Sequence, residues 1–118
     1  MSGHNALHDQ FTSDFAMLDP GNGNTLVVDR DRGVVELVTA AAETRTLADP
    51  DRSGLMLTLS LKTDGGDCVI TADTAINAAG NTILTFDNAG DTILLQSIPD
   101  GALDYKWKVL GNDGVALS

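Results

Sequence analysis

The sequence predicts an all-β fold, a small antiparallel β-sandwich or barrel of the β-tulip or jelly-roll kind, with an extended N-terminal arm. Apolar residues make up 42% of the 118 residues and aromatic residues only 4%, so the core must be built from Leu, Ile and Val, which favour strands. From Thr25 onward, short apolar segments are separated by Gly, Asn, Asp and Pro roughly every eight to twelve residues. This spacing predicts about eight strands in one domain.

Residues 1–24 are expected to form the arm and residues 25–118 the β domain. The first 20 residues contain no Lys or Arg and are rich in Gly, Asn and Asp. Phe11, Phe15 and Leu18 have the i, i+4, i+7 spacing of one helical face, which Pro20 ends. Two hypotheses remain open for these apolar residues: they cap the core of the domain, or they dock onto a partner.

The next segments predict a hairpin and then the central strand. Residues 25–29 and 34–39 are apolar and flank a turn that ends in Gly33, a residue free to adopt unusual backbone angles. After the long connection 40–54, residues 55–62 alternate Leu with Met, Thr, Ser and Lys, the two-residue period of a half-buried strand. The leucine face of this strand should be buried, at the centre of the fold.

The remaining strands are expected in five segments, namely 67–72, 81–87, 91–98, 103–111 and 115–118. Segments 81–87 and 91–98 share a Thr-Ile-Leu core, and two copies are too few for a solenoid, so they predict a hairpin. Segment 91–98 is apolar on both faces, with Ile93 and Leu95 against Leu94 and Ile98. A subunit interface could cover its second face.

Clusters of Asp and Gly recur along the chain, as in DGGD at residues 64–67. No cluster matches the EF-hand loop, whose alternating oxygen ligands end in a bidentate Glu. The clusters are therefore predicted to be turns, in which Gly65 and Gly66 would supply positive φ and Asp64 and Asp67 would bond the backbone. No metal site and no cofactor are expected.

Catalytic and nucleic-acid-binding patterns are missing from the sequence. The two histidines, His4 and His8, have no third ligand, and no nucleophile elbow or phosphate loop occurs. The net charge of −10 and the scattered basic residues argue against direct nucleic-acid binding. Cys68 is interpreted as a small buried hydrophobic residue, and no apolar run is long enough for a membrane span. The sequence thus predicts a non-enzymatic protein made in a cytoplasm, with no membrane partner.

The order of segments from Glu43 to the C-terminus forms a pattern of its own. It runs through "GLMLTLSLKTDGGD" and "INAAGNTILTFDNAGDTILLQS" to "YKWKVLGNDGVALS". The pattern resembles small structural proteins of tailed bacteriophages, in particular head decoration (cement) proteins, and related modules of tail fibres. It covers about two thirds of the chain and consists of strands, glycines and one late Trp, with no chemical motif. The arm lacks any family motif.

The resemblance implies a capsid decoration protein that binds the assembled bacteriophage head and stabilises it. Its partner would be the major capsid protein. The protein would be made in the host cytoplasm and would then lie on the outer capsid surface of the virion. It would form a homotrimer. Phe11, Phe15 and Leu18 would then form the capsid-binding arm. The expected subunit interface consists of Leu94, Leu95, Tyr105 and Trp107, with Trp107 anchoring either the core or the trimer axis. The alternative is a receptor- or glycan-binding β module of a tail fibre; a secreted calcium-binding adhesin unit is disfavoured because no metal motif and no signal peptide were found.

Overall fold

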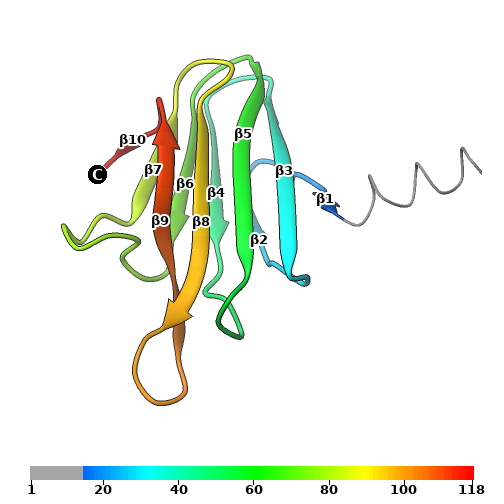
Figure 1. Ribbon diagram of the computed structural model, residues 1–118. Coiled ribbons are helices and arrows are strands. Elements are labelled where there is room, and N and C mark those ends of the chain that lie inside the picture. Colours follow the sequence, from blue (N-terminus) through cyan, green and yellow to red (C-terminus); the bar gives the residue numbers. More distant parts are fainter. Residues whose placement is uncertain (1–14) are drawn as a thin grey trace, which may run out of the picture.

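A computed structural model describes residues 15–118, which form two five-stranded sheets packed face to face (Figure 1). The first sheet contains, in spatial order, β1 (Ala16–Met17), β3 (Arg32–Thr39), β5 (Met56–Asp64), β8 (Thr92–Pro99) and β9 (Tyr105–Asp113). The second contains β10 (Ala116–Leu117), β7 (Ile83–Phe86), β6 (Cys68–Ala72), β4 (Glu43–Leu47) and β2 (Asn24–Leu26). The predicted all-β sandwich is confirmed, and the leucine-rich strand β5 lies at the centre of the first sheet.

The strand directions differ from the expected antiparallel arrangement. The first six strands alternate between the two sheets, so neighbours within one sheet run in the same direction: β1, β3 and β5 are parallel, and so are β2, β4 and β6. Strands β7 to β10 join their neighbours antiparallel. In the N-terminal half the chain therefore winds as a coil whose successive strands alternate between the two sheets. Only the C-terminal half has the antiparallel pairing that is typical of a jelly roll.

Two of the predicted hairpins are wrong for the same reason. Strands β2 and β3 lie in different sheets, and so do β7 and β8. The turn residues between them carry the chain from one sheet across to the other. Among the described residues, consecutive strands form a hairpin only at β6–β7 and β8–β9.

The core lies between the sheets and follows the two-residue period. Leu57, Leu59 and Leu61 of β5 are buried against the inward faces of the opposite sheet, which supplies Ile70 and Leu84. Each fully buried Leu contributes roughly 1.5–3 kcal/mol relative to exposure. The core includes Trp107, whose indole N–H donates to the carbonyl of Ala48 at 3.0 Å.

The fold begins before the boundary expected at residue 24. Ala16 and Met17 pair with β3, and the carboxylate of Asp19 bonds Arg45 of β4. Residues 16–24 thus belong to the sandwich, because pairing and an ion pair hold them there. Phe11, expected in the arm, lies outside the described residues.

Gly65 and Gly66 are needed for close packing, and the predicted positive φ is wrong for both. A Cβ on Gly65 would lie 2.3 Å from the carbonyl oxygen of Thr39, and one on Gly66 would lie 2.3 Å from the carbonyl carbon of Ala41. The Thr39 hydroxyl donates to the carbonyl of Gly66 at 2.6 Å, which ties the two connections together. The DGGD segment is therefore a crossing between sheets that only glycine allows.

Candidate functional site

The first candidate surface is the edge of the sandwich where the described chain begins, here called the N-terminal edge and defined by Phe15, Leu18 and Val27. Both outer strands at this edge are short, two residues in β1 and three in β2. Leu18 is 90% exposed, Val27 61% and Phe15 42%. Leu18 and Met17 line two hollows of about 370 and 350 Å³, the first lined also by Val27 and the second by Val34. An exposed apolar edge of this kind is typical of an interaction surface.

Asp19 fixes the backbone of the N-terminal edge. Its carboxylate accepts hydrogen bonds from Arg45 Nε at 2.6 Å and Nη2 at 2.8 Å, and from the backbone N–H groups of Val38 and Gly21. Burial alone would raise the pKa of Asp19, but these donors outweigh it and hold the pKa below its usual range. Leu18 is therefore presented from an anchored position.

Arg45 is the buried partner in this arrangement, with a side chain only 1% exposed. Besides Asp19 it contacts Glu43 at 3.1 Å, and its Nη1 lies 3.4 Å from the sulfur of Cys68. Burial raises the pKa of Cys68 to about 11, although the nearby guanidinium opposes the shift. The cysteine is a protonated thiol at neutral pH, and the cluster holds the sheets together.

Phe15 and Arg32 form the outer end of the N-terminal edge. The guanidinium carbon of Arg32 lies 5.4 Å from the centre of the Phe15 ring, within the range of a cation–π contact. This contact holds the ring on the surface of β3 and leaves much of it in water. Phe15 and Leu18 therefore do not cap the core.

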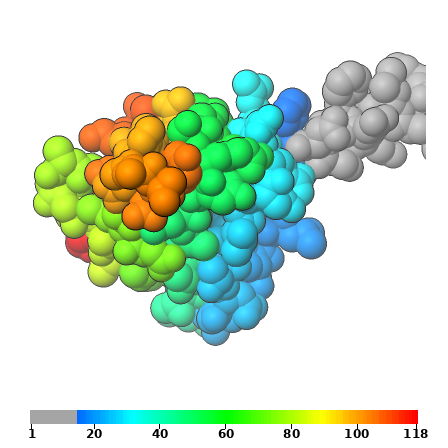
Figure 2. Space-filling view, turned by 90° about the horizontal axis from the view of Figure 1, so that it is seen from below, coloured from blue at the N-terminus to red at the C-terminus, as the bar shows by residue number. Residues whose placement is uncertain are grey.

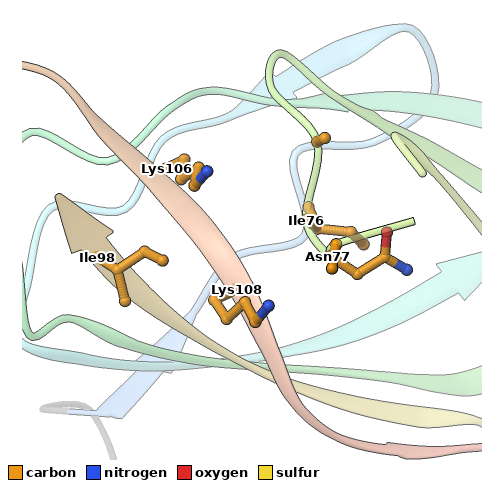
Figure 3. Close-up of a pocket in the computed structure, with 7 residues that line it drawn as sticks. Ile76, Asn77, Ile98, Lys106 and Lys108 are labelled. Carbon is orange, nitrogen blue, oxygen red and sulfur yellow. The ribbon is translucent and has the colours of Figure 1, made fainter. Parts of the chain in front are cut away.

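The second candidate surface is a pocket at the opposite edge of the first sheet, beside β9. It is here called the lysine pocket and is defined by Ile98, Lys106, Lys108 and residues 75–78. Lys106 and Lys108 rise from β9, with Ile98 of β8 on one side and Ile76 and Asn77 on the other (Figure 3). Its volume is about 220 Å³. The carbonyl of Ile76 accepts the N–H of Val109 at 2.9 Å, which fixes the β6–β7 connection along the free edge of β9.

The two candidate surfaces lie apart on the molecule. Strands β1 and β9 are the first and last strands of the first sheet. In the view from below, the N-terminal residues in blue and the β8–β9 turn in orange occupy different sides (Figure 2). Two partners could therefore be held at once.

The structure divides the expected subunit interface. Leu95 and Trp107 face the core and are fully buried within one chain, so neither side chain is exposed to a second copy, and Trp107 takes the core alternative. Leu94 and Tyr105 are half-buried at the surface of the β8–β9 hairpin. The sequence did contain a signal for the lysine pocket, because the alternation that directs Trp107 inward directs Lys106 and Lys108 outward.

The Asp-Gly clusters form turns, as DNAGD at residues 87–91 illustrates. Asp91 accepts the backbone N–H groups of Asp87 and Asn88, both at 3.1 Å. Asn112 similarly bonds the backbone of Val115 through both its side-chain atoms. Within residues 15–118, no three His, Cys, Asp or Glu side chains gather where they could hold a metal ion.

Comparison with known proteins leaves the surfaces as the main guide to function. No family model matches the chain, and no curated protein matches its sequence. In the described part of the chain, no helix has the length and apolar character needed to cross a membrane. The fold and the two surfaces define the chain as a small all-β sandwich module with candidate sites for macromolecular contacts.

Proposed function

We propose that the chain is a non-enzymatic decoration (cement) protein of a bacteriophage head, a homotrimer that binds the major capsid protein on the outer surface of the assembled shell. The observation that supports this proposal is the apolar N-terminal edge, where Leu18, Val27 and Phe15 are exposed together beside a backbone that Asp19 and Arg45 anchor. A partner that covers such a group of apolar side chains removes them from water, which favours binding.

The N-terminal edge suits docking onto a preformed surface. Covering a Leu or Phe side chain contributes roughly 1.5–3 kcal/mol, and Leu18 lines two hollows that a partner side chain could enter. The segment that precedes Phe15 adds Leu7 and Phe11 to the apolar residues at this end of the chain. Together they offer several anchors, the usual way in which a few residues supply most of the affinity.

Stabilisation of the shell follows from binding linkage. A protein that binds the assembled lattice and not free capsid subunits shifts the equilibrium away from disassembly. At a concentration 100-fold above the dissociation constant, each occupied site adds about 2.7 kcal/mol. No catalytic step is required for this function.

A glycan-binding tail-fibre module receives less support from the structure. Trp107, the sole tryptophan, is buried, and its N–H is used by Ala48, so it cannot stack on a sugar ring. Sugar recognition relies on exposed aromatic faces. Phe15 is the exposed large aromatic residue among those described, and Arg32 already lies over its ring.

Co-sedimentation with heads of the virus that encodes the chain tests the proposal. The wild-type chain should sediment with assembled heads, remain in the supernatant with unassembled capsid protein, and raise the melting temperature of the heads. Leu18→Ser should lower occupancy. Leu103→Ser is the matched control, because Leu103 is 88% exposed but lies in the β8–β9 turn, far from β1 in the first sheet.

A deletion separates docking from folding. Removal of residues 2–14 should preserve the melting temperature of the free chain, because β1, the Asp19–Arg45 ion pair and the buried core residues are all kept, and it should reduce head occupancy. Removal of residues 2–20 should also lower the melting temperature of the free chain, because β1 and the Asp19 carboxylate are lost. If the wild-type chain fails to sediment with heads, the proposed function is wrong; if the 2–14 deletion binds as tightly as wild type, the arm has no part in it.

A further inference from the structure

The lysine pocket is unusual because of how its charges are satisfied. The chain carries 17 acidic and 7 basic residues. Among the described residues, Arg30, Arg45, Arg52 and Lys62 each lie within 4.0 Å of a carboxylate oxygen. The guanidinium of Arg32 lies over the ring of Phe15. Lys108 has neither, and Lys106 reaches Asp100 only at 3.6 Å. A cation without a carboxylate partner in so acidic a protein is a position where an external carboxylate would be favoured.

The surroundings of the two ammonium groups specify the ligand chemistry. Both lysines are half-buried, which weakens the screening of their charge by water. Ile98, Ala75 and Ala78 supply apolar walls, and Asn77 supplies an amide that is already bonded to Asn81. A carboxylate on a short aliphatic stem, as in Asp or Glu, fits such a pocket better than a bulky or highly charged anion.

We propose that the lysine pocket binds an exposed acidic side chain of a second copy of this chain and thereby joins copies head to tail. The proposal rests on the proposed function for the homotrimer that the contact would build. Charge complementarity supports a second copy as the occupant: the rest of the molecule is strongly acidic, and its exposed carboxylates include Asp64, Asp73 and Asp113.

The charges also determine the symmetry of the contact. A two-fold contact centred on the pocket would place Lys106 and Lys108 of one copy against the same residues of the other, which is repulsive. The pocket must therefore meet a different, acidic surface of its partner. Contacts of this kind either close into a ring or extend into a fibre, and a three-membered ring is the closed form that agrees with a homotrimer.

Light scattering coupled to size exclusion tests the contact in the free chain. The wild-type chain should form a concentration-dependent oligomer that dissociates as ionic strength rises. Lys108→Glu should raise the dissociation constant at least about tenfold, because a like charge then faces the incoming carboxylate. Lys62→Glu is the matched control: it makes the same charge change on the same outer sheet face, on β5, and should leave the oligomer intact.

A second variant and a chemical probe make the result independent of folding. Lys106→Gln with Lys108→Gln removes the charges without adding new ones and should also dissociate the oligomer, while circular dichroism stays unchanged. Zero-length carbodiimide coupling of a mixture of ¹⁴N- and ¹⁵N-labelled chains should give mixed-isotope peptides that join Lys106 or Lys108 to an acidic residue of another copy.

Several outcomes would overturn the inference. A wild-type chain that is monomeric at 100 µM would do so, as would an oligomer that survives both lysine variants, or one that Lys62→Glu disrupts equally. Intermolecular coupling that never involves Lys106 or Lys108 would do the same. These results are distinct from failure of the proposed function, because head binding is measured separately by co-sedimentation.

Discussion

Removal of the Asp19 carboxylate should destabilise the fold, because it leaves Arg45 buried with fewer partners. Breaking a buried ion pair by deleting one member typically costs 3–5 kcal/mol. Asp19 is 14% exposed and Glu43 still contacts Arg45, so we expect the lower end of this range for Asp19→Ala, about 3 kcal/mol. For a domain of this size the melting temperature should fall by about 10 °C.

Urea unfolding followed by the fluorescence of Trp107 measures this loss directly, because Trp107 is the single tryptophan and is buried. Asp29→Ala is the control. Its ion pair with Arg30 is exposed, and such pairs contribute between zero and about 1 kcal/mol. A loss below about 1 kcal/mol for Asp19→Ala, or one equal to that of Asp29→Ala, would refute the argument that Asp19 anchors the N-terminal edge.

The pH dependence of stability gives an independent check. The pKa of Asp19 is lower in the folded protein than its ordinary value of 3.8, so the unfolded chain binds the proton more readily. The stabilisation is therefore fully present above the ordinary carboxyl range and is lost as pH falls through the folded pKa. Asp19→Asn should be less stable than wild type at neutral pH, and the difference should shrink on acidification below about pH 4.

Three further predictions concern the turns and the cysteine. Gly66→Ala should destabilise the fold by about 2 kcal/mol or more, whereas Gly111→Ala, where a Cβ meets nothing within 4 Å, should be nearly neutral; thermal melting distinguishes them. Cys68 should resist alkylation by iodoacetamide at pH 8 until urea unfolds the chain, since its pKa is about 11; rapid labelling of the native protein would contradict this. EDTA and calcium should leave the melting temperature unchanged if the Asp-Gly clusters act only as turns, and a large shift restored by calcium would count against that assignment.

The strands were predictable because burial alternates along them. The leucines of residues 55–61 identified the centre of the first sheet, and the alternation in "YKWKV" separates buried Trp107 from the outward lysines. The interface prediction included Leu95 and Trp107, although the same alternation directs both side chains into the core. The two-residue alternation of apolar side chains shows which residues of a strand are buried. It does not show whether a second sheet or a second subunit covers them.

The connections were not predictable in the same way. A turn rich in Asp and Gly can fold a strand back beside its neighbour or carry it across to the opposite sheet, and the residue types are alike in both cases. The role of Arg45 was hidden for a related reason. Its partner Asp19 is remote in sequence, and an arginine between two threonines gives no sign that it points inward.

The winding of the first six strands has a consequence for the time the chain needs to fold. Val34 cannot pair with Thr58 until the chain has visited the other sheet and returned, and the same holds for Thr46 and Thr71. Such non-local pairing places folding in the millisecond-to-second range, while the local β8–β9 hairpin can form far earlier. Since each turn of the coil supports the next, strands β3 to β6 should exchange their amide hydrogens only when the whole sandwich opens. The short terminal strands β1 and β10 should exchange well before that.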